Sequence, residues 1–194
     1  APKGSRKNLP VMFWIHGGGN TSGHKDFYDF SKLVKKEDVI VVSTNYRLGP
    51  LGFFTHPSIQ DFNTGIDKTS NFAILDIIEA LKWVNTNIEK FGGNPNNITI
   101  FGESAGGHNV LSLLVAPQAK GLFHKAISQS GYTKSSSLED AYKSKYFNEE
   151  TASDSWSVFN KILLQQEVVK TLNDADKYQV NASKETQREI LYKT

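Results

Sequence analysis

The stretch that decides the fold is Ile98-Thr99-Ile100-Phe101-Gly102-Glu103-Ser104-Ala105-Gly106. Its first four residues are apolar or β-branched and are typical of a buried strand, and the apolar run 110–115 that follows is typical of a packed helix. A glycine–x–serine–x–glycine pattern between a strand and a helix predicts a sharp turn that lifts the Ser104 hydroxyl clear of the sheet. Gly102 and Gly106 leave room where the backbone is tight and the helix packs close to the strand. We therefore expect Ser104 to be a nucleophile.

A serine hydroxyl reacts with a carbonyl group only when a base removes its proton and hydrogen-bond donors stabilise the resulting anion. A second glycine cluster could supply those donors. His16-Gly17-Gly18-Gly19 follows the apolar run 9–15, and small residues after a strand allow backbone N–H groups to approach a developing oxyanion. The remaining donor would be the N–H of Ala105. The two motifs together favour a serine hydrolase over two unrelated glycine turns.

The sequence does not supply an evident base for Ser104. Only His108 and His124 follow it, and no acidic residue lies between Ser104 and either of them. In hydrolases with this type of turn, the order along the chain is serine, acid, histidine. We expect His16 to order the glycine loop and His108 to be structural. The remaining histidines are expected to be solvated: His24, His56 and His124.

Strand-like and helix-like segments alternate along the first two thirds of the chain. Expected strands cover 9–15, 38–44, 97–101 and 126–129, and expected helices cover 26–36, 71–91 and 105–115. This alternation predicts the α/β class, with a mostly parallel sheet flanked by helices. Sites in such sheets form at the carboxyl ends of the strands. Gly17–Gly19, Asn45–Arg47, Ser104 and Ser130 all follow expected strands and should converge there.

The remaining segments are more polar. Residues 55–70 are rich in turn formers and are expected to form a loop, and residues after Tyr132 carry two short amphipathic patterns, at 157–169 and 185–192. We expect one incomplete catalytic domain over 1–194, in which 1–131 form the sheet core with the glycine loop and the serine turn, and 132–194 form a helical excursion.

Composition excludes several classes of function. The net charge is +2 over 194 residues, with no basic cluster, so nothing favours nucleic-acid binding. The absence of cysteine excludes disulfides and thiol nucleophiles, and we expect no metal site. The apolar runs are too short to predict a membrane span. Both ends of the chain look cut, so the lack of a targeting signal does not indicate the compartment. The sequence leaves the oligomeric state open as well.

In combination, several segments resemble the type-B carboxylesterases, the cholinesterase-like branch of the α/β-hydrolase superfamily, and within it the bacterial, para-nitrobenzyl-esterase-like members. The similarity is dense from Pro10 to Gly131. The segments that carry it are Pro10–Gly19 (PVMFWIHGGG), Val42–Gly49 (VSTNYRLG), Ala80–Pro95, Phe101–Gly107 (FGESAGG) and Ser128–Gly131 (SQSG).

This resemblance implies an incomplete α/β-hydrolase fold and the hydrolysis of small-molecule carboxylic esters through an acyl-enzyme, without any cofactor. It also implies the roles of particular residues. These are the nucleophile Ser104, the oxyanion-hole donors Gly18, Gly19 and Ala105, and the polar groups Glu103 and Ser130 beside the catalytic residues. The acid and the histidine of the family lie beyond this chain, so we expect a fragment with little activity alone.

Two other functions remain open from the sequence. A non-catalytic adhesion or binding module can share this fold, but such modules commonly lose the nucleophile, whereas Ser104 and the glycine loop are both present here. A lipase with an apolar lid is a further alternative, and the polar sequence after Gly131 argues against it.

Overall fold

The computed structural model describes residues 7–144 and 154–193. The chain divides into two compact units. We call residues 1–52 with 72–134 the sheet unit, and residues 53–71 with 135–194 the helical unit. Residues 53–71 group with the C-terminal helices and not with the sheet.

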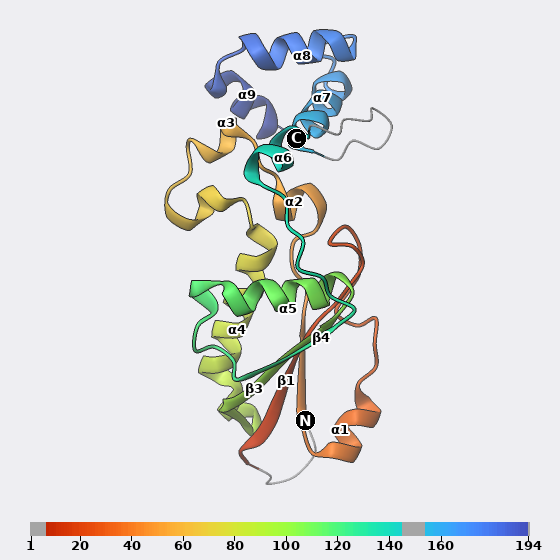
Figure 1. The fold of residues 1–194 in the computed structure, drawn as a ribbon, viewed down its shortest axis with the longest axis vertical. Helices are drawn as coiled ribbons and strands as arrows, with labels where there is room; N and C mark the ends of the chain where they lie inside the picture. The colour runs from red at the N-terminus through yellow and green to blue at the C-terminus, as the bar shows by residue number, and fades with distance from the viewer. Residues whose placement is uncertain (1–6, 145–153, 194) are drawn as a thin grey trace. The chain divides into compact units, whose positions relative to one another are not determined.

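The sheet unit contains a four-stranded parallel sheet (Figure 1). The strands are β1 (Leu9–Ile15), β2 (Ile40–Thr44), β3 (Gly93–Glu103) and β4 (Lys125–Gln129), and their order is β2-β1-β3-β4. In the central pair, Phe13 of β1 lies opposite Ile100 of β3. The predicted α/β class and parallel sheet are therefore confirmed, and the glycine loop and the serine turn follow two neighbouring strands.

Helices connect these strands. They are α1 (Ser31–Glu37), α2 (Gly49–Phe53), α4 (Phe72–Asn87), the 3₁₀ turn η2 (Ile88–Phe91), α5 (Ala105–Val115) and the 3₁₀ turn η3 (Pro117–Ala119). The predicted helix at 26–36 is wrong at its start, because the Asp29 carboxylate accepts the Ser31 N–H at 2.9 Å and α1 begins only there. The predicted helix at 71–91 continues as η2 and ends at Gly92, as expected of a left-handed glycine cap.

The two faces of the sheet carry different side chains. Val11, Phe13 and Ile100 are fully buried, as are Ile77 and Leu81 on the apolar stripe of α4. On alternate positions of β1 and β3, Trp14 and Phe101 contact each other, and both contact Phe30, which immediately precedes α1. Helix α1 lies apart from α4 and α5 (Figure 1). The nearly continuous apolar run of β1 thus packs against separate layers on the two faces of the sheet.

The helical unit packs short helices around a small apolar core. Its elements are α3 (Pro57–Gln60), the 3₁₀ turn η1 (Gly65–Thr69), α6 (Leu138–Tyr142), α7 (Ser155–Gln165), α8 (Leu172–Asn181) and α9 (Lys184–Leu191). Phe159, Leu163 and Ala175 are fully buried. The expected loop at 55–70 is wrong, because His56 caps α3 by accepting the Ser58 N–H and Pro57 suits its first turn. Within the described residues, no helix is long and apolar enough to cross a membrane.

Candidate active site

Ser104 lies in a strained turn between β3 and α5. Its backbone angles are φ 55° and ψ −121°, a conformation that non-glycine residues rarely adopt. Two hydrogen bonds hold the turn: the Ser104 N–H donates to the Gln129 carbonyl at 2.8 Å, and the Ser104 carbonyl accepts the His108 N–H at 3.0 Å. The turn and the helix lie where the sequence predicts them, and the strand predicted over 97–101 is longer, running from Gly93 to Glu103.

The glycine loop runs directly beside this turn. A Cβ atom added to Gly17 would lie 2.6 Å from the Glu103 carbonyl oxygen and 3.2 Å from the Ser104 Cβ. Any side chain at this position would therefore force the loop away from the serine. The adjacent turn is closed by the Gly18 carbonyl, which accepts the N–H groups of Thr21 and Ser22 at 3.1 and 3.0 Å.

Three backbone N–H groups in the glycine loop and the serine turn donate no hydrogen bond in the described part of the chain. Gly18 and Gly19 have φ angles of 102° and 65° at the carboxyl end of β1, and Ala105 is the first residue of α5. None of the hydrogen bonds among the described residues is donated by the N–H of Gly18, Gly19 or Ala105. Such N–H groups at a helix start and a glycine turn suit an anionic oxygen.

The two other predicted polar residues flank the turn. Glu103 is the last residue of β3 and is half-buried, and its Oε2 would lie 3.1 Å from a Cβ on Gly17. Ser130 follows β4 in a left-handed conformation, with φ 54°, and is exposed. The structure thus brings Glu103 to the glycine loop. Ser130 is brought to the carboxyl edge of the sheet, and no hydrogen bond from its hydroxyl to Ser104 is present among the described residues.

No histidine side chain of the described residues is hydrogen-bonded to the Ser104 hydroxyl. His108 contacts the Tyr132 carbonyl through Nδ1 and packs against the Tyr132 ring. His124 Nδ1 accepts the Ile98 N–H at 3.2 Å, directly before the pairing of β3 with β4 begins at Thr99 and Lys125. His16 is buried and its Nδ1 lies 2.8 Å from the Gly17 carbonyl. These contacts agree with the structural roles expected for His16 and His108.

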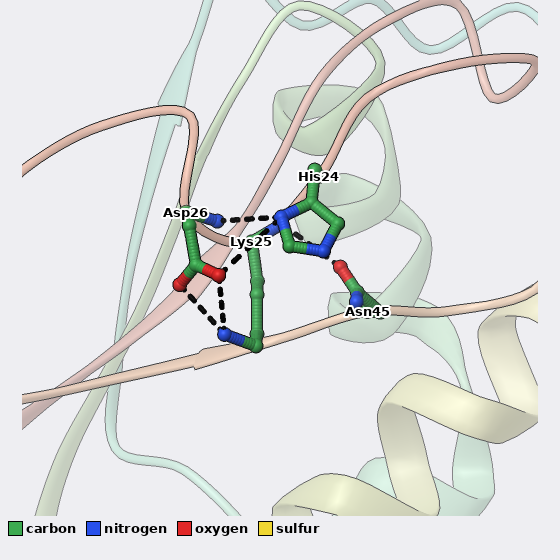
Figure 2. Close-up of polar contacts among 4 residues, drawn as sticks. All are labelled: His24, Lys25, Asp26 and Asn45. Atoms are coloured by element: carbon green, nitrogen blue, oxygen red, sulfur yellow. Dashed lines mark hydrogen bonds and ion pairs between the residues drawn. The ribbon is translucent and has the colours of Figure 1, made fainter.

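His24 is exposed in a polar surface cluster, shown in Figure 2. Its Nδ1 lies 3.4 Å from Asp26 Oδ2, and the neighbouring Lys25 ammonium contacts both Asp26 oxygens at 2.6 Å. The hydrogen bond from Lys25 holds the pKa of Asp26 below its ordinary value. The Lys25 backbone N–H donates to the Asn45 side chain at 2.8 Å, which fixes the segment after the glycine loop to the end of β2. The cluster therefore has a structural role, because it holds the segment at residues 24–26 next to Asn45.

Sequence reasoning missed three buried groups. His56, expected to be solvated, is 1% exposed in the helical unit and is hydrogen-bonded to Ser58 and Gln179. Tyr46 and Asn109 of the sheet unit are also buried, and both contact the glycine loop. Their positions directly after a strand and on the helix of the serine turn were a usable signal. Among the described residues, no cluster of side chains could hold a metal ion.

Comparison with known proteins identifies the family. The model of the carboxylesterase family matches residues 1–190. The para-nitrobenzyl esterase of Bacillus subtilis (strain 168) is 50% identical over 143 residues, covering 73% of this chain and 28% of that protein. A human protein named cocaine esterase is 54% identical over 126 residues, covering 64% of this chain and 21% of that protein.

Solved structures agree with these matches. A thermophilic PNB esterase has 38% sequence identity and a TM-score of 0.69, covering 100% of this chain and 36% of its own. A carboxylesterase from Geobacillus stearothermophilus has 34% identity and a TM-score of 0.67, covering 96% of this chain and 36% of its own. The chain therefore spans about a third or less of the length of these relatives. The fold is that of the α/β-hydrolases, and the chain belongs to the carboxylesterase family.

Proposed function

We propose that the protein containing this chain hydrolyses small-molecule carboxylic esters, with Ser104 as the nucleophile. The Ser104 hydroxyl attacks the ester carbonyl carbon, the C–O bond to the alcohol breaks, and the acyl group is held on the serine until water releases it as the acid. The N–H groups of Gly18, Gly19 and Ala105 stabilise the oxyanion of each tetrahedral intermediate. Loss of one such donor typically costs about 2.7–4 kcal/mol of transition-state stabilisation.

The observation that carries this proposal is the arrangement of a strained serine beside unpaired backbone donors. Ser104 has a positive φ at the start of α5, Gly17 lies against it without room for a side chain, and the donors on either side have no partner in the described residues. Backbone strain of this kind persists where the surrounding structure requires it, commonly at catalytic positions.

The described contacts include no base that could remove the proton of the Ser104 hydroxyl. No histidine of the described residues is hydrogen-bonded to the Ser104 hydroxyl. The relatives of this chain are about three times as long as it is. We propose that the acid and the histidine that activate Ser104 belong to sequence that naturally adjoins this chain. On this proposal, the 194-residue chain alone turns over esters weakly or not at all.

Hydrolysis of para-nitrophenyl acetate tests the role of Ser104 in the protein expressed with its naturally adjoining sequence. We expect Ser104→Ala to lower kcat by about a thousandfold or more, because removing the nucleophile leaves only residual catalysis. The matched control is Ser112→Ala on the same helix, since within the described residues the Ser112 hydroxyl bonds the His108 carbonyl, at 3.1 Å, and no group of the serine turn. A Ser104→Ala protein that keeps its rate would refute the proposal.

The competing function is a non-catalytic binding module on the same fold. The intact serine turn and glycine loop favour catalysis over this alternative. A fluorophosphonate probe, which reacts covalently with activated serines, separates the two. Labelling that is lost in Ser104→Ala supports the esterase, and absence of any adduct at Ser104 supports the binding module.

A further inference from the structure

The glycine loop is attached to α5 by a pair of side-chain amides that the mechanism above does not use. Asn20 directly follows Gly19, and Asn109 lies on α5 five residues after Ser104. The Asn20 amide donates to Asn109 Oδ1 at 3.3 Å, and the Asn109 amide donates to Asn20 Oδ1 at 2.9 Å. Each residue is therefore both donor and acceptor to the other, across 89 positions of sequence.

Tyr46 holds the same loop from the side of β2. Its hydroxyl donates to the His16 carbonyl at 2.6 Å and lies 3.3 Å from Asn20 Oδ1, while its ring stacks on His16 at 4.4 Å. Burial raises the pKa of Tyr46 to about 12, so the hydroxyl keeps its proton even above the ordinary tyrosine pKa of about 10. The Gly49 N–H donates to the Asn20 carbonyl at 2.6 Å. Both ends of the loop are thereby fixed.

The burial of Asn109 indicates that the pair does more than fill space. Apart from the tyrosine Tyr46, the buried polar residues in the described part of the sheet unit are His16, which begins the glycine loop, and Asn109, which bonds Asn20 at its end. A buried amide is unfavourable unless its hydrogen bonds are formed, by about 1–3 kcal/mol. An apolar residue would pack at position 109 without that requirement, but it could not define the position of Asn20.

We infer that Asn20 and Asn109 are positioning residues for the oxyanion hole. They fix the loop that carries Gly18 and Gly19 relative to the helix whose first residue, Ala105, supplies the remaining donor. The inference rests on the proposed function, because it assumes that these N–H groups bind the oxyanion. Donors must lie about 2.7–3.1 Å from that oxygen, and a displacement of about 1 Å can lower the rate on the order of a hundredfold.

The test uses Asn109→Ala and Asn20→Gly in the esterase expressed with its naturally adjoining sequence. We expect each variant to lower kcat for para-nitrophenyl acetate roughly ten- to a hundredfold while KM changes less than about twofold, since a displaced donor weakens binding of the transition state more than of the substrate. Active sites are counted by fluorophosphonate titration to completion, so a variant that merely folds poorly loses titrated sites and keeps its kcat per site.

Two further measurements separate positioning from general stability. A trifluoromethyl ketone inhibitor, whose serine adduct carries an oxyanion, should bind more weakly by the same factor as the fall in kcat/KM. The double variant Asn20→Gly with Asn109→Ala should lose no more than the larger single loss, because Asn20→Gly alone already removes the amide pair that Asn109→Ala removes. The matched control is Asn85→Ala on α4, whose amide bonds the Pro95 carbonyl at the opposite end of β3, and it should keep its kcat.

Failure of the positioning role can be told apart from failure of the proposed esterase function. If Ser104→Ala abolishes activity but Asn20→Gly keeps its kcat per titrated site, the positioning role is overturned and the esterase mechanism stands. Independent, additive losses in the double variant would also overturn it. If Asn109→Ala does not fold, Asn20→Gly still decides the matter, because Asn20 is only half-buried and its φ of 58° suits glycine.

Discussion

The two units of this chain bury different chemistry. In the described part of the sheet unit the buried side chains are almost all apolar. Apart from Tyr46, the buried polar residues are His16 in the glycine loop and Asn109, which bonds Asn20 beside it. The helical unit buries a connected set of polar groups besides its apolar core, among them His56, Asn160 and Gln179. The sheet unit is held by packing, and the helical unit also depends on satisfied hydrogen bonds.

This difference explains where each unit tolerates change. A packed apolar core loses stability when the volume of a buried side chain changes, because protein interiors have few voids to absorb the change. A buried polar network fails when one partner is removed, because the remaining donors and acceptors have already lost their water. The following substitutions test this contrast, one kind of failure at a time.

The largest effect is expected at Gly106, in the helix of the serine turn. An added Cβ would lie 2.7 Å from the His16 carbonyl oxygen and 2.9 Å from its carbon, and these are backbone atoms that cannot rotate away. We expect Gly106→Ala to lower the free energy of unfolding of the sheet unit by about 3 kcal/mol. Hydrogen exchange of the amides in β1 and β3 measures this.

The control for Gly106 is Gly121, which has open space around its Cβ position and a φ of 81°. Asparagine tolerates this left-handed conformation, so Gly121→Asn should cost less than about 1 kcal/mol. Equal losses at the two positions would show that the sheet unit does not depend on the close approach of α5 to the glycine loop.

Much of the sheet unit could be predicted from the sequence. The period of apolar residues in α4 and the short apolar runs of β1 and β3 specify these elements locally. The positions of Ser104 and the glycine loop follow from motifs whose geometry depends on the backbone. The position of Asn109 on the helix of the serine turn could be predicted, but its pairing with Asn20 could not, because the two residues lie 89 positions apart and amides are ordinarily exposed.

Less of the helical unit could be predicted. α8 is polar along most of its length, with only Ala175 and Gln179 buried, so its sequence has no apolar stripe. The segment 55–70 looks like a loop because Pro57 and several turn formers dominate it, although Pro57 also suits the first turn of α3, which His56 caps. Helices whose buried faces are polar are specified by long-range partners, and periodicity does not detect them.

A smaller loss is expected in the polar network of the helical unit. Gln179 donates to the Trp156 carbonyl at 2.9 Å and to Asn160 Oδ1 at 2.6 Å, and its Oε1 lies 3.1 Å from His56 Nε2. Gln179→Leu keeps the volume and leaves these groups unpaired. We expect the free energy of unfolding of the helical unit to fall by about 2 kcal/mol, measured by hydrogen exchange in α7 and α8.

The control for Gln179 is Gln165, an exposed glutamine at the end of α7. Gln165→Leu should change the same exchange rates by less than about 0.5 kcal/mol, because it removes no buried hydrogen bond. If Gln179→Leu is equally mild, the network contributes nothing to stability, and the helical unit is held by its apolar core in the same way as the sheet unit.

The mildest effect expected is a dependence of the helical unit on pH through His56. Because Gln179 uses its amide nitrogen for other partners, its Oε1 accepts from His56 Nε2. His56 Nδ1 is then left to accept from Ser58, whose hydroxyl lies at 2.6 Å and whose N–H donates at 3.2 Å. A second proton on His56 would occupy Nδ1 and break that bond. Burial, opposed by the hydrogen bond to Gln179, holds the pKa of His56 below its ordinary value of 6.5.

The sign of the effect follows from this lowered pKa. Below pH 6.5 the unfolded chain takes up a proton at His56 that the folded unit resists, so stability is complete above pH 6.5 and decreases as the pH falls below it, by at most about 1.4 kcal/mol per pH unit. Hydrogen exchange in α7 and α8, corrected for its intrinsic pH dependence, should show this loss. His56→Gln should remove it, and His24→Gln, at an exposed histidine of the sheet unit, should not. A helical unit that keeps this pH dependence in His56→Gln would locate the acid sensitivity elsewhere and reduce His56 to one more packed ring beside Phe54 and Phe159.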